Sequence, residues 1–132
     1  MSLDAKILRS PQFTSVTISG PASLDDFVGL MTTLGEQTRR EGDKRVLVNL
    51  LGVEGELKFT DHFQLGSQAA QLLRHLDKLA SVVPADKITR TSEKVALKQG
   101  FQLRVFTSAD EAVRWLGESL QRNGAAAKDE KV

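Results

Sequence analysis

The segment from Arg45 to Leu51 constrains the fold more than any other part of this 132-residue chain. Its sequence, Arg-Val-Leu-Val-Asn-Leu-Leu, is almost continuously apolar and lacks the alternation of a strand with one wet face. Such a run is typical of a parallel strand that helices cover on both faces. We therefore predict that residues 45–51 form the central strand of an α/β sheet.

Strand and helix patterns alternate on both sides of this segment. Two strands, at 5–9 and 13–19, are separated by Ser10-Pro11 and predict an antiparallel hairpin. Apolar residues at three- and four-residue spacing behind a capping residue predict helices. We expect helices from Ser23 to about Gly42, from Thr60 to about Leu76, from Thr91 to Gly100 and from Ser108 onward. We also expect strands at 79–83 and 101–105 and a loop at 52–58.

This order of elements predicts one α/β domain. The expected architecture is a small mixed, largely parallel sheet with an N-terminal antiparallel hairpin, packed against about four helices. A length of 132 residues is ordinary for a single domain. We assign the domain to residues 1–120 and expect the polar residues 121–132 to be a disordered tail.

Composition narrows the classes of function. A formal net charge of +1 gives no overall field that would attract nucleic acid or an anionic membrane. The chain has no cysteine, which excludes disulfides and thiolate chemistry and favours a reducing compartment. We see neither a signal sequence at the start nor an apolar run of about 20 residues. We therefore expect a cytoplasmic protein with no stable membrane insertion and no nucleic-acid partner.

Metal and catalytic patterns are sparse. His62 and His75 lie 13 positions apart, not the four that place two ligands on one helix face. No nucleophile elbow and no glycine-rich phosphate loop is present. We therefore expect no metal and no cofactor.

Basic residues predominate between Arg74 and Arg104. We interpret this stretch as solvated helix and loop surface. The alternative is a face for an acidic partner, a phosphate-bearing ligand or a membrane surface.

Three segments in the second half of the chain carry a recognisable pattern. They are 79–83, 101–106 and 109–116, where an Arg-Val-Phe strand and a short acidic turn precede a Glu-Ala-x-x-Trp-Leu helix. With the buried strand at 45–51, they resemble the SpoIIAA-like branch of the STAS superfamily, over roughly residues 5–120. The resemblance implies a small module with a sheet on one side and helices on the other.

The resemblance also implies a range of functions. Members act as phospho-switched partners of anti-sigma factors, as cytoplasmic domains of anion transporters, or as sensor modules. The SpoIIAA-like branch is similar in fold to Sec14 lipid-binding domains. The family thus implies either a protein partner or a small ligand.

The phospho-switch of the family can be compared residue by residue. Antagonists of the sporulation type carry Asp-Ser-Ser-Gly at the start of the second helix, where the helix N-terminus favours a phosphate. Here Asp61 matches the aspartate, but His62 and Phe63 stand in place of the two serines. Thr60 keeps a hydroxyl one residue earlier, and we expect it to cap the helix rather than to accept a phosphate. We therefore expect a module without the serine switch.

Three hypotheses for the function remain. The first is a non-enzymatic regulatory or interaction module that binds a protein partner or a second copy of itself. The second is a carrier or sensor of an apolar or lipid-like ligand, which could be anionic, held where the small residues at 66–70 leave room between the sheet and the second helix. The third is a hydrolase-like enzyme that uses Asp61 and His62.

Seven residues are candidates for a binding site. His62 titrates near neutrality and could contact a ligand, or it could simply be a partly exposed residue beside a helix cap. Leu65 and Leu72 would widen the core face or form an apolar patch. Trp115 would close the core or lie at an interface. The candidates are Thr60, Asp61, His62, Phe63, Leu65, Leu72 and Trp115.

Overall fold

A computed structural model describes residues 4–21, 23–55, 58–87 and 90–118. Along these residues, five strands alternate with four α-helices, and a short 3-10 turn (η1, Ala85–Lys87) follows the fourth strand. The predicted tail at 121–132 lies outside the described residues. The strands are β1 (Asp4–Arg9), β2 (Thr14–Pro21), β3 (Arg45–Glu54), β4 (Lys78–Val82) and β5 (Leu103–Phe106), and the helices are α1 (Leu24–Glu41), α2 (Phe59–Leu72), α3 (Thr91–Lys98) and α4 (Ala109–Gly117).

The central strand is β3, as the apolar run at 45–51 predicts. The sheet has the order β1-β2-β3-β4-β5, with β1 antiparallel to β2 and every other pair parallel. Val46 and Val48 pack in the core on one face, whereas Leu47 packs in a second core on the other face. Both faces of β3 are buried, which explains the missing polar alternation. The predicted mixed, largely parallel fold with an antiparallel hairpin is confirmed.

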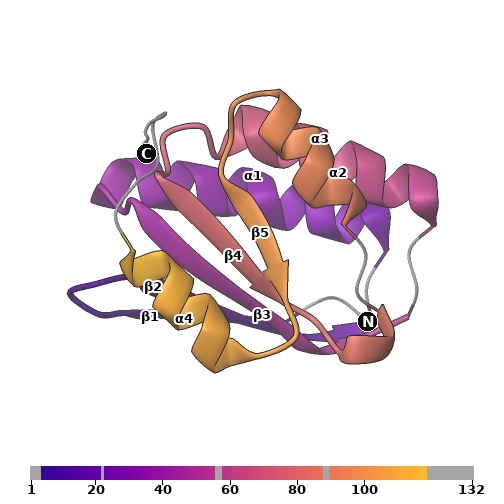
Figure 1. Cartoon of the computed structure of the whole chain (residues 1–132), viewed down its shortest axis with the longest axis horizontal. Helices are drawn as coiled ribbons and strands as arrows, with labels where there is room; N and C mark the ends of the chain where they lie inside the picture. Colours follow the sequence, from indigo (N-terminus) through magenta and orange to yellow (C-terminus); the bar gives the residue numbers. More distant parts are fainter. Residues whose placement is uncertain (1–3, 22, 56–57, 88–89, 119–132) are drawn as a thin grey trace, which may run out of the picture.

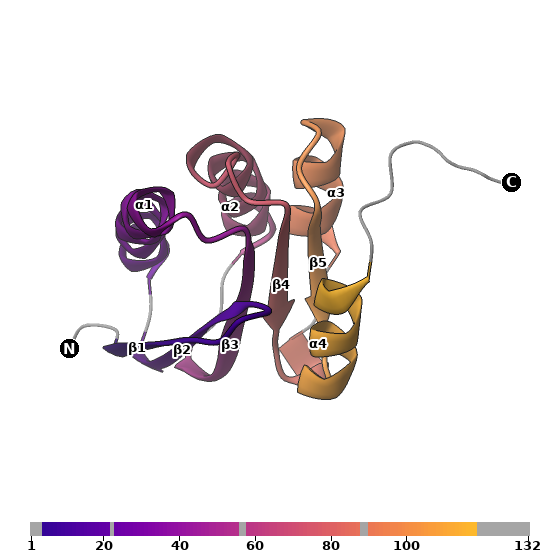
Figure 2. The same ribbon diagram turned by 90° about the vertical axis from the view of Figure 1, so that its left-hand side faces the viewer.

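Helices cover both faces of the sheet. In the described residues, α1, α2 and α3 lie together on one face, and α4 lies on the opposite face against β3, β4 and β5 (Figure 1 and Figure 2). The arrangement implied by the family resemblance, with helices on one side of the sheet only, is therefore wrong, whereas the burial of both faces predicted from residues 45–51 is confirmed. The cause is the apolar stripe of Ala112, Trp115 and Leu116 on α4, which packs against Leu47 and its neighbours on the second face.

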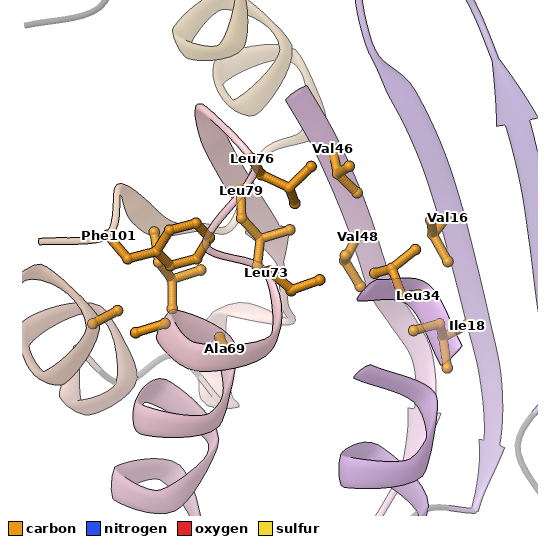
Figure 3. Packing of buried hydrophobic residues seen from close by; sticks show 13 residues of the cluster. Val16, Ile18, Leu34, Val46, Val48, Ala69, Leu73, Leu76, Leu79 and Phe101 are labelled. Atoms are coloured by element: carbon orange, nitrogen blue, oxygen red, sulfur yellow. The ribbon is translucent and has the colours of Figure 1, made fainter. Parts of the chain in front are cut away.

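The larger core lies between the sheet and the first three helices. Leu34 of α1 and Leu73 of α2 point toward Val48 of β3 (Figure 3). Burying one leucine side chain of this kind contributes about 1.5–3 kcal/mol. This packing holds α2 on the sheet with its first turn near the carboxyl ends of the parallel strands.

Two boundaries differ from the prediction by more than two residues. β3 continues through residues 52–54, which were expected in a loop, because they pair with residues 19–21 at the end of β2. α2 ends at Leu72 instead of Leu76, because Leu73 leaves the helical conformation (φ −115°, ψ 21°). The extension of β3 depends on its pairing with β2, which is distant in the sequence. The earlier end of α2 depends on the turn toward β4.

Two glycines of α1 offer a matched test of helix packing. A Cβ atom on Gly35 would lie 2.6 Å from the carbonyl oxygen of Leu72 in α2, whereas one on Gly29 would meet nothing within 4 Å. We expect Gly35→Ala to lower the free energy of unfolding by about 1–3 kcal/mol, because the helices must separate. Gly29→Ala should raise it by up to about 1 kcal/mol, because alanine is the better helix former. Urea denaturation followed by circular dichroism measures both, and equal changes would contradict the close approach.

Candidate ligand pocket

A pocket lies between the sheet and the three helices that share its larger core. Its volume is about 130 Å³. It extends toward the carboxyl ends of the parallel strands, the edge at which open α/β sheets bind their ligands. Its apolar wall includes Phe27, Met31, Leu50, Leu65, Leu73 and Leu103.

One end of the pocket is closed and apolar, and the other is more open and polar. At the closed end, Leu73, Leu79 and Leu103 are at most 5 % exposed. A ligand would therefore place its apolar part at this end and a polar group at the other. Four partly exposed polar side chains line that other end: His62, Ser81, Lys87 and Ser92.

Most of these polar groups have no hydrogen-bond partner in the part of the chain that the structure describes. Within the described residues, the side chains of His62, Ser81 and Ser92 make no hydrogen bond. The Nζ atom of Lys87 donates to the carbonyl oxygen of Gly55 at 3.0 Å and has two further N–H groups. Polar groups beside apolar walls are stabilised when water or a ligand completes their hydrogen bonds. This end of the pocket can therefore bind a polar group.

The charge at this end comes from Lys87. Partial burial lowers the pKa of His62, and the neighbouring Asp61 carboxylate only partly opposes this effect. His62 is therefore neutral at pH 7. Among the described residues that line the pocket, Lys87 is the only charged side chain.

Four of the candidate residues, Thr60 to Phe63, lie at the start of α2 but have different surroundings. The N-cap is Lys58, whose backbone N–H donates to Oδ2 of Asp61 at 2.9 Å. The expectation that Thr60 caps the helix is wrong, because the extended residue before the helix is Lys58 and Thr60 lies exposed inside the first turn. Phe63 is 53 % exposed. Of the four, His62 lines the pocket.

The other three candidates lie in different places. Leu65 lines the pocket, and Leu72 packs against the larger core. Trp115 is 8 % exposed and packs between α4 and the sheet, with its ring centroid 5.7 Å from that of Phe106. The structure therefore brings Leu65 and His62 together in one pocket and places Trp115 on the opposite face of the sheet.

Three polar residues of the pocket were not predicted from the sequence. Ser81 is the lone hydroxyl in the apolar strand at 79–83, and this could have indicated the site. Ser92 lies in the first turn of the helix expected from Thr91 to Gly100, and nothing local distinguishes Lys87 from other surface lysines. The small residues at 66–70 were expected to leave room between the sheet and α2, but Gly66 faces α3 instead. A Cβ on Gly66 would lie 2.5 Å from the carbonyl oxygen of Ser92.

The basic stretch at 74–104 does not form one solvated surface. Lys78 is 3 % exposed, and its Nζ atom donates to the carbonyl oxygens of Trp115 at 2.7 Å and Glu118 at 2.8 Å. The interpretation as solvated surface is therefore wrong for Lys78, whose ammonium binds the end of α4. Lys87, from the same stretch, lines the pocket instead.

Across residues 4–21, 23–55, 58–87 and 90–118, no group of three or more His, Asp or Glu side chains is placed to hold a metal ion. None of the helices described there combines the length and the apolar character needed to cross a bilayer. The second histidine, His75, lies beyond the end of α2, with its Nε2 atom 2.6 Å from Oγ1 of Thr38.

The described residues define a class of protein: an α/β domain with a mostly parallel sheet and a small pocket at the carboxyl edge of its strands. Within that class, the SpoIIAA-like family model matches residues 13–117, and the chain belongs to this family. The resemblance inferred from the sequence is confirmed.

Two solved structures are similar to the chain. An anti-sigma factor antagonist from Mycobacterium paratuberculosis is 14% identical, with a TM-score of 0.61, over 89% of this chain and 96% of that chain. An uncharacterized protein of the DUF3478 family with a SpoIIAA-like fold, from Shewanella loihica PV-4, is 17% identical, with a TM-score of 0.54, over 87% and 94%. No curated protein sequence matches the chain. At these identities the two structures show the fold alone.

Proposed function

We propose that this SpoIIAA-like domain is a non-enzymatic regulatory module that responds to a small, mainly apolar ligand. The observation that carries the proposal is the pocket, with buried leucines at one end and, at the other, polar side chains that are mostly free of hydrogen bonds within the described residues. Apolar walls with a few convergent polar groups are the usual composition of a small-molecule site. The likeness in fold to an anti-sigma factor antagonist supports a regulatory role with a protein partner.

The volume of the pocket decides which ligands fit. About 130 Å³ lies well below the roughly 300–1,000 Å³ of sites for drug-sized ligands. It is close to the volume of an engineered cavity of about 150 Å³ that binds benzene. We therefore favour a compact ligand over the whole lipid that the Sec14 resemblance implies.

The neighbourhood of His62 supports a switch more than catalysis. A general base must reach its nucleophile through a hydrogen bond. In the described residues, His62 makes no such bond to Ser81 or Ser92, and Asp61 serves as a cap for α2. His62 lines the pocket, and the next residue, Phe63, is largely exposed. A ligand that moves the first turn of α2 would change the surface that a partner meets, at the position where relatives carry the phosphorylated serine.

Thermal unfolding in the presence of benzene, toluene and hexan-1-ol tests the proposal. A ligand that binds only the folded domain raises its melting temperature, and we expect at least one probe to do so for the wild type. Ala69→Leu fills the pocket that Ala69 lines, and it should abolish the increase relative to its own unliganded baseline. Ala109→Leu, at an exposed position of α4, should leave the increase unchanged. No increase with any probe in the wild type would contradict the proposal.

A further inference from the structure

We propose that the pocket selects a compact monocarboxylate of about six carbons, with its apolar body among the leucines and its carboxylate beside Lys87. This inference rests on the proposed function, because it names the chemical class of the ligand for the same pocket. It is carried by the charge, the unpartnered donors and the volume of the site.

Lys87 brings a positive charge to the open end of the pocket. Among the described residues, the partner of its Nζ atom is the neutral carbonyl oxygen of Gly55. Within the described residues, the ion pairs are Arg9–Asp43 and Arg90–Glu93, so Lys87 has no carboxylate partner. An anion at the open end of the pocket would complete the hydrogen bonds of this ammonium, and charge-assisted bonds of this kind are the stronger ones.

The site favours a negative ligand over a positive one. The acidic groups in the first turns of α2 and α3 are already engaged: Asp61 accepts the Lys58 N–H, and Glu93 accepts from Arg90 at 3.0 Å and from the Val105 N–H at 2.8 Å. Neither carboxylate lines the pocket. The N-terminal ends of α2 and α3, which contribute His62 and Ser92 to the pocket, add a further bias toward negative charge. Among the described lining residues, an ammonium ligand would meet Lys87 and no carboxylate.

The open end of the pocket has more hydrogen-bond donors than a neutral alcohol can use. A carboxylate has two oxygens that accept several hydrogen bonds. The hydroxyl groups of Ser81 and Ser92 and the neutral imidazole of His62 can each donate one, and Lys87 has two N–H groups left. A neutral alcohol would use fewer of these donors and would leave the ammonium unpaired.

The size of the pocket limits the length of the ligand. The buried leucine side chains close the inner end, and a volume of about 130 Å³ accommodates a group of about the size of benzene. A six-carbon chain or a phenyl group fills such a space. Longer chains would have to displace Leu73, Leu79 or Leu103, which are almost fully buried.

Isothermal titration calorimetry with hexanoate, hexan-1-ol, hexylamine and decanoate tests this inference on the full chain. We expect hexanoate to bind about 10-fold to 150-fold more tightly than hexan-1-ol, the range of one charge-assisted hydrogen bond. Hexylamine and decanoate should bind more weakly than hexan-1-ol and hexanoate, respectively. Hexanoate should also raise the pKa of His62, followed by NMR, because a nearby carboxylate favours the imidazolium.

Variants of Lys87 locate the effect. Lys87→Gln should bind hexanoate and hexan-1-ol equally, whereas Lys87→Arg, which keeps the charge, should retain most of the preference for the acid. Lys94→Gln removes an exposed charge from α3 and should behave like the wild type. An equal loss in Lys94→Gln and Lys87→Gln would overturn the inference, because it would indicate a general effect of surface charge.

The two proposals can fail separately. Equal wild-type affinities for hexanoate and hexan-1-ol would overturn the selection of a carboxylate but leave the pocket as a ligand site. Failure of hexanoate, hexan-1-ol, benzene and toluene to bind would overturn both.

Discussion

Leu73→Ala should lower the free energy of unfolding by about 2.7–5 kcal/mol. Leu73 is 0 % exposed and lies between α2 and the sheet, where it points toward Val48 (Figure 3). The substitution loses the transfer free energy of the buried atoms and leaves a cavity that fixed strands and helices cannot fill. Urea denaturation at 25 °C, followed by circular dichroism, measures the change.

Leu97→Ala is the matched control. Leu97 belongs to α3 and is 57 % exposed, so the same chemical change should alter stability by no more than about 0.5 kcal/mol. Similar losses for the two variants would show that Leu73 does not occupy the core in the way described.

The same substitution bears on ligand size. Leu73 lines the closed end of the pocket, so its truncation should extend the space available to a chain. If Leu73 sets the length limit, octanoate should gain affinity relative to hexanoate in Leu73→Ala. An unchanged ratio would place the limit elsewhere in the wall.

Local sequence patterns were sufficient to predict the order of the elements, but not to predict which face of the sheet each helix covers. The run at 45–51 predicted a strand buried on both sides, and β3 is that strand. The stripe on α4 predicted a buried helix, but periodicity does not say which face of a sheet it covers. That choice depends on Leu47, Ala80 and Phe106, which face α4 only after the sheet has formed.

The pocket was predictable only in the part that α2 contributes. His62 and Leu65 are close in sequence, and both were candidates. Ser81, Lys87 and Ser92 come from β4, η1 and α3, and they meet only because these elements converge at one edge of the sheet. Nothing in the spacing of these residues encodes that convergence.

The position of Lys78 in the fold also could not be predicted from its local sequence. Among the predictions made for this protein, its replacement should have the second largest effect on the free energy of unfolding. In the sequence it is one lysine of a basic stretch, but in the fold its Nζ atom donates to two carbonyl oxygens at the end of α4 and lies 4.8 Å from the centre of the Trp115 ring. Burial lowers the pKa of Lys78, and the neighbouring Arg45 adds to this effect. The ammonium therefore loses hydration, but it satisfies carbonyl groups at the negative end of the helix.

We expect Lys78→Met to lower the free energy of unfolding by about 2–3 kcal/mol, because methionine replaces the stem but leaves the carbonyl groups without their donor. Trp115 is the only tryptophan of the chain, so its fluorescence reports the loss directly. Lys94→Met, at an exposed position of α3, should change stability by less than about 0.5 kcal/mol. The affinity of Lys78→Met for hexanoate should stay within about twofold of the wild type, because α4 packs on the face of the sheet opposite the pocket and distant sites act independently. A large loss of hexanoate affinity in the still-folded variant would mean that the two faces of the sheet are coupled through β3 and β4. A stability of Lys78→Met equal to that of Lys94→Met would mean that Lys78 does not hold the end of α4.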